Sequence, residues 1–156
     1  MKILKAEKAD LYEILELQYL SYRSEAEIYN DNNIQPLKQT LMDLENEFEQ
    51  QLMLKAIIDQ RIIGSVRAFE KDQVCQIGKL IVHPEYQNKG IGTKLLSEIE
   101  KIFNKCRKYE LFTGEKSRRN IYLYNKLGYT VFNTTEINEN LKIIFLEKHN
   151  RMNMIY

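Results

Sequence analysis

The residues whose types and spacing could do chemistry lie between Ile77 and Phe103, in the sequence IGKLIVHPEYQNKGIGTKLLSEIEKIF. The apolar run from Leu80 to Val82 predicts a buried strand, because β-branched residues suit a pleated surface. A polar turn and the sequence QNKGIG follow. The next apolar residues recur at helical spacing, at Ile91, Leu95, Ile99 and Ile102. The segment therefore predicts a strand, a glycine-bearing loop and a helix.

The start of such a helix can bind an anion. The backbone N–H groups of its first turn have no partner within the helix, and they carry the positive end of the helix dipole. Gly90 and Gly92 lack a Cβ, so a ligand can come close to these groups, and Lys89 and Lys94 add positive charge beside them. The expected ligand is a phosphate or a pyrophosphate.

Two common phosphate-binding motifs fit this loop poorly. A Walker loop requires GxxxxGK[ST], but Gln87 stands where its first glycine belongs. A dinucleotide-binding fingerprint requires GxGxxG directly after the strand. Leu95 takes the place of its third glycine, and the loop after the strand is too long for the tight turn.

A third interpretation rests on two stretches of sequence. VHPEYQNKGIGTKLL closely resembles the acetyl-CoA motif of the GNAT family of N-acetyltransferases, in which [QR]xxGx[GA] joins a strand to the pyrophosphate-binding helix. Residues 117–129, SRRNIYLYNKLGY, are similar to that family's SxxNxxLYxxxGY helix. The two matches come in the family's order and cover about the C-terminal half of the chain.

The resemblance implies a fold, a co-substrate and an activity. The GNAT fold is α/β of the α+β type, with a mixed, mostly antiparallel sheet flanked by about four helices. The implied reaction transfers an acetyl group from acetyl-CoA to a primary amine by direct attack, without a metal. The strand backbone would pair with the pantetheine arm like an added strand. The implied cofactor-binding residues are Leu80, Ile81, Val82, Gln87, Asn88, Lys89, Gly90, Ile91, Gly92, Thr93 and Asn120.

Tyr124 is the catalytic residue that the resemblance implies. In the family, the tyrosine at this place protonates the leaving thiolate. A thiol has a pKa of about 8.5 and a phenol about 10, so the phenol can donate only if it is positioned beforehand. By its helical spacing alone, Tyr124 would be a half-buried core residue beside Ile121 and Leu127.

The polar residues around this helix have two interpretations each. Asn120 would bond the pantetheine region or would simply suit a first helical turn. Ser117 stands where many family members carry asparagine. Three basic side chains form a solvated face or meet the 3′-phosphate of CoA, and these are Lys116, Arg118 and Arg119.

The expected general base is missing from its usual place. Many family members carry a glutamate on the third strand, and the matching position here is Gln76. An amide cannot take a proton at neutral pH. Either the base lies elsewhere or the amine arrives neutral. The candidate carboxylates are Glu25, Glu27, Asp31 and Glu115, the first three in the loop expected to wall the acceptor site.

The remaining elements follow from hydrophobic patterning. We expect a strand over residues 2–5, a first helix ending near Tyr22, a polar loop over residues 24–33 and a second helix from Pro36 to about Phe48. Strands are expected at residues 52–58, 61–69 and 74–82, with a bulge or a close backbone approach at Gly78. A strand (109–113), a helix (117–127) and a closing hairpin (129–135 and 141–148) complete a mixed sheet flanked by helices.

Composition favours an ordinary folded domain. With 156 residues, the chain is expected to form one domain over residues 1–156, and 23 basic against 22 acidic residues indicate neither a nucleic acid nor a membrane as partner. The isolated Cys75 and Cys106 predict free thiols in a cytoplasmic protein, and two unpaired histidines predict no zinc site.

The acceptor and the oligomeric state stay open. A small molecule or a peptide could supply the amine, and a homodimer is compatible with the sequence. A second class of function is a non-catalytic acyl-CoA-binding or sensor protein with the same fold. Gln76 favours this alternative, and Tyr124 argues against it.

Overall fold

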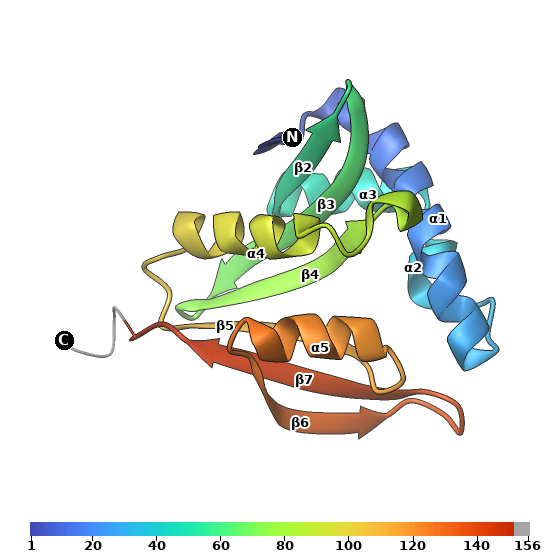
Figure 1. Ribbon diagram of the computed structural model, residues 1–156, viewed down its shortest axis with the longest axis vertical. Coiled ribbons are helices and arrows are strands. Elements are labelled where there is room, and N and C mark those ends of the chain that lie inside the picture. The colour runs from blue at the N-terminus through green and yellow to red at the C-terminus, as the bar shows by residue number, and fades with distance from the viewer. Residues whose placement is uncertain (152–156) are drawn as a thin grey trace.

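The computed structural model describes residues 1–151, and these form a seven-stranded sheet in the order β1-β2-β3-β4-β5-β7-β6 (Figure 1). Neighbouring strands are antiparallel except for β4 and β5, which run parallel. The expected mixed, mostly antiparallel sheet is therefore confirmed. The strands are β1 (Lys2–Lys5), β2 (Leu52–Ile58), β3 (Arg61–Lys71), β4 (Val74–Val82), β5 (Lys108–Gly114), β6 (Thr130–Glu136) and β7 (Lys142–His149).

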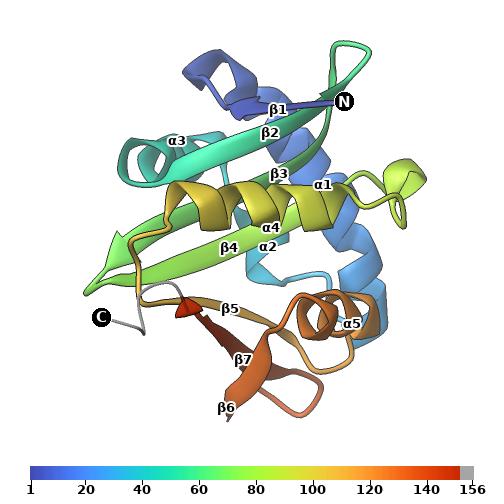
Figure 2. The same cartoon turned by 60° about the vertical axis from the view of Figure 1, so that its left-hand side comes forward.

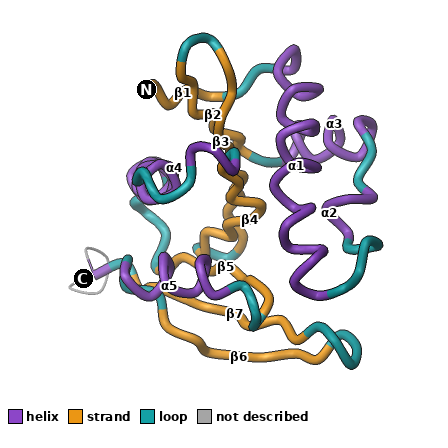
Figure 3. Tube along the Cα trace, turned by 45° about the vertical axis from the view of Figure 1, so that its right-hand side comes forward, coloured by secondary structure: helices purple, strands orange, loops and turns teal. Residues whose placement is uncertain are grey.

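Helices cover both faces of this sheet. On one face lie α1 (Leu11–Tyr29), α2 (Gln35–Lys38) and α3 (Leu41–Gln50), and on the other lie α4 (Ile91–Ile102) and α5 (Arg118–Lys126) (Figure 3). Figure 2 shows α4 crossing β3 and β4, with α5 beside the lower half of the sheet. Two short 3₁₀ helices, η1 (Lys8–Asp10) and η2 (Pro84–Tyr86), precede α1 and α4. Within residues 1–151, no helix combines the length and the apolarity needed to cross a membrane.

Each helical layer buries its own apolar cluster against the sheet. Leu95, Leu96 and Ile99 of α4 pack with strand residues and with Tyr124 and Tyr129. Leu11, Ile14 and Leu44 pack on the opposite face. Cys75 and Cys106 are both buried thiols and neither is in a disulfide, as the sequence predicted.

The first helix is longer than predicted. It continues past Tyr22 to Tyr29, so the stretch expected to be a loop is largely helical. The prediction of a loop rested on the polar residues of this stretch. It was wrong because glutamate and alanine are also good helix formers. Ala26 and Tyr29 are buried and anchor the extra turns, and Asn30, in the left-handed conformation, ends the helix.

The second predicted helix is divided into two. Gln39 and Thr40 adopt extended backbone conformations and separate α2 from α3. The Thr40 hydroxyl accepts from Asp43 N, and Asp43 accepts from Thr40 N, so a capping box restarts the helix. The break directs the Gln39 side chain into the interior, where it forms hydrogen bonds with Gln18 and Arg67.

Strands β4 and β5 part after a short stretch of pairing. Only Val74–Gln76 pair with Lys108–Glu110, and the strands then diverge toward α1 (Figure 1). Beyond this point β4 is bent, because its register with β3 shifts between Ser65 and Arg67. The predicted irregularity near Gly78 is confirmed, although the residue in the left-handed conformation is its neighbour Lys79, at a φ of 46°.

Replacing either of two glycines beside this opening with alanine should affect the free energy of unfolding differently. A Cβ on Gly114 would lie 2.0 Å from the Tyr29 hydroxyl, whereas a Cβ on Gly78 would have no heavy atom within 4 Å. We expect Gly114→Ala to lower the free energy of unfolding by about 1–3 kcal/mol. The control, Gly78→Ala, should stay within about 0.5 kcal/mol of wild type. Urea unfolding followed by circular dichroism tests this, and equal stabilities of the two variants would contradict the close contact at Gly114.

Candidate functional site

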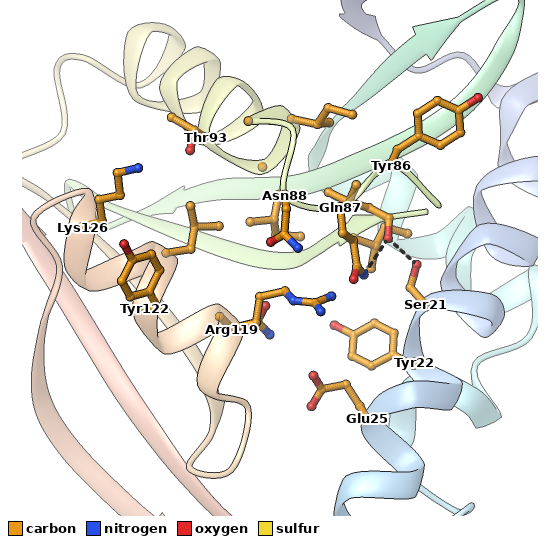
Figure 4. A pocket seen from close by; sticks show the side chains of 18 residues that line it. Ser21, Tyr22, Glu25, Tyr86, Gln87, Asn88, Thr93, Arg119, Tyr122 and Lys126 are labelled. Carbon is orange, nitrogen blue, oxygen red and sulfur yellow. Dashed lines mark hydrogen bonds between the residues drawn. The ribbon is translucent and has the colours of Figure 1, made fainter. Parts of the chain in front are cut away.

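A cavity of about 330 Å³ lies between the start of α4, the free edge of β4, α5 and the second half of α1 (Figure 4). Its walls bring together segments that are far apart in the sequence. Ser21, Tyr22 and Glu25 come from α1, and Arg119, Tyr122 and Lys126 come from α5. We refer to this as the first cavity.

The start of α4 supplies the anion-binding end of this cavity. Gly90 caps the helix at a φ of 82°, a left-handed conformation that glycine adopts without strain. A Cβ on Gly92 would lie 3.1 Å from the Leu123 side chain of α5 and 3.7 Å from Leu80. The first turn of α4 therefore lies against the cavity with little room for a side chain at Gly92.

The free edge of β4 supplies the second wall. Beyond Gln76 the edge that faces β5 is not paired in the sheet, so its backbone groups are open to an extended ligand. The Val82 carbonyl is already engaged, because Gln87 Nε2 and Ser21 Oγ each donate to it at 3.3 Å. These bonds fix the loop after β4 against α1.

The structure places nearly all the predicted cofactor-binding residues around the first cavity. The exception is Lys89, whose ammonium lies 5.3 Å from the centre of the Tyr86 ring. Of the three basic residues near α5, Arg119 lines the cavity, whereas Lys116 and Arg118 do not. The predicted residues that line it are Leu80, Ile81, Val82, Gln87, Asn88, Gly90, Ile91, Gly92, Thr93 and Asn120.

A second, larger cavity of about 960 Å³ lies on the side of the sheet that faces α1 to α3. Its walls include Arg67 and Phe69 of β3, Gln76 and Gly78 of β4, and Phe112 of β5. Four residues line both cavities, so the two spaces meet there. They are Tyr22, Glu25, Leu80 and Asn120.

Tyr22 and Glu25 bring titratable groups to this junction. Burial raises the pKa of the Tyr22 phenol to about 12, and Arg67 opposes the shift while Glu25 adds to it. The phenol is therefore protonated at neutral pH. In Figure 4 the Tyr22 ring lies between Glu25 and the Arg119 guanidinium.

A short chain of hydrogen bonds holds Glu25 in place. Ser117 Oγ donates to a Glu25 carboxylate oxygen, so the Tyr29 hydroxyl, 2.9 Å from Ser117 Oγ, must be the donor in that second contact. Tyr29 in turn accepts from Lys116 N at 2.9 Å. Ser117, which stands where the family often has asparagine, thus ties α1 to the start of α5.

Tyr124 is buried in the apolar cluster that includes Leu95 and Ile99 of α4, and it lines neither cavity. Its side chain is 4% exposed and its ring lies 6.2 Å from that of Tyr129. Burial raises the pKa of Tyr124, and Tyr22 and Glu25 add to the shift. The phenol is therefore protonated at neutral pH, and Tyr22 and Glu25 lie within electrostatic reach of it.

The four candidate bases differ in position. Glu25 lines both cavities and Asp31 lines the second, whereas Glu27 and Glu115 are exposed and line neither. Gln76 also lines the second cavity, and its Nε2 donates to Glu110 at 3.0 Å. Of these carboxylates, the structure brings Glu25 to the place where the cavities meet.

Tyr22 and Arg67 are site residues that the sequence analysis does not predict. The predicted first helix ends near Tyr22, whereas the observed helix continues and its further turns carry Glu25. The helical spacing from Gln18 through Tyr22 to Glu25 is the pattern that could have indicated a common face. Arg67 stands in an otherwise apolar strand segment, which marks it as a buried charge.

Comparison with known proteins assigns the family. The sequence model of the acetyltransferase (GNAT) family matches residues 9–129, so the chain belongs to this family. An L-methionine sulfoximine/L-methionine sulfone acetyltransferase from Salmonella typhimurium is 28% identical over 146 residues, covering 84% of this chain and 81% of the relative. An acetyltransferase from Pectobacterium atrosepticum is 31% identical over 100 residues, and the match covers 62% of this chain and 71% of that relative.

Solved structures share the fold. PaiA N-acetyltransferase from Thermoplasma acidophilum, in complex with coenzyme A, superposes with a TM-score of 0.77 at 23% identity, covering 95% of this chain and 98% of that one. A Salmonella typhimurium protein solved with its cofactor acetyl-CoA gives a TM-score of 0.74 at 22% identity, covering 96% and 94%. The GNAT fold expected from the two sequence motifs is therefore confirmed.

Proposed function

We propose that the protein transfers an acetyl group from acetyl-CoA to a primary amine by direct attack of the amine on the thioester. The observation that carries this proposal is the meeting of the two cavities at Tyr22, Glu25, Leu80 and Asn120. One cavity has the features of an anion and pantetheine site, and the other gives a second reactant access from the opposite side of the sheet. Relatives solved with coenzyme A or acetyl-CoA support the choice of co-substrate.

In this proposal the first cavity holds acetyl-CoA in an extended form. The pyrophosphate lies at the first turn of α4, where unpaired N–H groups and the helix dipole stabilise it. The pantetheine arm runs along the free edge of β4 between Ile77 and Val82. The thioester then reaches the junction, and holding both reactants there supplies much of the rate.

Proton transfer at the junction needs an acceptor and a donor. Glu25 is placed to take the proton of the amine, directly or through water, because it lines both cavities. Tyr124 donates to the thiolate of coenzyme A as it leaves. Its raised pKa keeps the phenol protonated, so its contribution depends on position rather than on acidity.

The alternative of a non-catalytic acyl-CoA sensor is less well supported. Its sequence argument was the absence of a carboxylate at Gln76, and Glu25 supplies one at the junction from another element. Release of free thiol from acetyl-CoA, measured over a panel of amines, separates the two functions. The panel should include L-methionine sulfone, because the Salmonella relative is named as an acetyltransferase of this compound. Acetyl-CoA binding without thiol release from any amine would favour the sensor.

The pyrophosphate assignment predicts the effect of a side chain at Gly92. Gly92→Val should weaken binding of coenzyme A by about tenfold or more, because the side chain occupies the approach to the first turn of α4 and contacts Leu123. Calorimetric titration measures this, with circular dichroism to establish that the variant is folded. Ser97, in the middle of the same helix and outside the first cavity, provides the control Ser97→Val. Unchanged affinity in a folded Gly92→Val protein would remove the phosphate site from this helix.

The acid assignment predicts a loss in kcat alone. Tyr124→Phe should lower kcat by about 10²-fold with little change in acetyl-CoA affinity, because only the hydroxyl is lost. Tyr22→Phe is the matched comparison, since Tyr22 is the tyrosine that lines both cavities. Steady-state kinetics and calorimetry on both variants decide the assignment. If Tyr22→Phe alone lowers kcat, the acid is Tyr22.

A further inference from the structure

We propose that the acceptor is a small amine that also carries an anionic group, such as an apolar amino acid. The second cavity binds the anionic group of this acceptor beside Lys79 and Arg67. The inference rests on the proposed acetyl transfer and names its substrate class. It comes from a group of charged side chains in the second cavity that the transfer chemistry does not use.

Arg67 is the centre of this group. It projects from β3 toward α1 and α3 and is 2% exposed. Its Nη1 donates to Glu47 Oε2 at 2.8 Å and to Gln39 Oε1 at 3.2 Å, and its Nη2 donates to Gln18 Oε1. Among the described residues, its Nε is a buried donor with no hydrogen-bond partner. Such a donor is costly unless something completes its environment.

The charges around Arg67 do not balance. Lys79 Nζ lies 3.3 Å from Glu47 Oε1, so two cations share the single carboxylate of Glu47. Lys79 is only 17% exposed, and burial lowers its pKa, with Arg67 adding to the shift. Lys71 also lines the cavity. This part of the cavity thus has a positive excess that an anion would neutralise.

There is open space for an anion next to these cations. Gly78 is the register partner of Arg67 on β4, and both residues line the second cavity. A Cβ on Gly78 would meet no heavy atom within 4 Å, so the cavity extends to the strand backbone there. The bulge at Lys79 turns its side chain toward Glu47 rather than leaving it in the regular alternation of the strand.

The opposite charges lie on other elements. Glu25, near the end of α1, lines the cavity at the junction, and Asp31, in the turn after α1, lines it elsewhere. An acceptor with a cationic amine near Glu25 and an anion near Lys79 would match both groups of charges. Leu80, which lines both cavities, directly follows Lys79, so the proposed anion site begins one residue along β4 from the junction.

The rest of the cavity wall is apolar. Phe69 and Phe112 from the sheet, with Ile137, Leu141 and Ile143 from the closing hairpin, line it. Phe112 and Ile137 are each 57% exposed, which is unusual for large apolar side chains beside a polar site. They would contact the body of an apolar amino acid, since concave sites pair apolar walls with a few polar groups.

The test compares amines that differ only in charge. L-leucine and L-phenylalanine are each paired with their primary amides, and kcat/KM is measured by release of free thiol from acetyl-CoA. The acids should be preferred by about tenfold or more. A difference in amine basicity would favour the amides instead. The amine of an amino acid amide is less basic than that of the acid, so a larger fraction of it is neutral and reactive at neutral pH. A 1-aminoalkylphosphonate with the leucine side chain tests whether the anion is a carboxylate or a phosphonate.

Variants locate the anion site. Lys79→Met should reduce the preference for the acid to about threefold or less, because the acid loses one of the two cations beside its anionic group. Glu47 loses its bond to Lys79 but keeps its bond to Arg67 in this variant, so its carboxylate is not left unpaired. Lys38→Met makes the same change of charge on the exposed face of α2, outside the second cavity, and should keep the preference.

A binding measurement separates this inference from the proposed function. Calorimetry on the protein loaded with coenzyme A gives the affinity of each acid and amide without turnover. Equal or tighter binding of the amides, or a preference for the acids that Lys79→Met does not change, would overturn the anion site even if amines are acetylated. If no amine releases thiol, the proposed function fails, and tighter binding of the acids that is lost in Lys79→Met would still support the anion site.

Discussion

The parting of β4 and β5 is the constraint on which the site depends. The two strands pair over three residues each and then separate, so backbone groups of β4 that a continuous sheet would satisfy are left open. Because the opening passes through the sheet, a ligand on the α4 side and one on the α1 side can meet at Leu80. The bulge at Lys79 bends β4 beside this opening, and the helix that starts at Ile91 presents its first turn to the first cavity.

The far side of the opening is closed by α1 rather than by the sheet. Tyr29, Ser117 and Glu25 form hydrogen bonds from the last turns of α1 to the start of α5, and Gly114 leaves just enough space for the Tyr29 hydroxyl. These bonds hold Glu25 where the cavities meet and connect α1 to the start of α5. The seven additional residues of α1 beyond Tyr22 are therefore part of the site and not only of the fold.

The order and type of the elements could be predicted from the sequence because they depend on local patterns. Alternation gave the strands, and helical spacing with Gly90 and Gly128 gave the start of α4 and the end of α5. The first cavity followed as well, since its motif is contiguous. The junction could not be predicted, because Glu25 reaches it only through helix packing. Arg67, Glu47 and Lys79 come from three elements whose contacts no local pattern specifies.

The anion proposal gives a physical reason for the amide at position 76. Burying a cation such as Arg67 costs desolvation free energy. Proteins in which apolar residues replace a buried ion pair are often equally stable or more stable. The presence of Arg67 is easier to understand if the positive excess serves a ligand. Gln76 lines the same cavity and donates to Glu110. A glutamate there would add negative charge to the cavity that, in our proposal, binds the anionic acceptor, so a neutral side chain at position 76 fits a mechanism in which Glu25 is the proposed base.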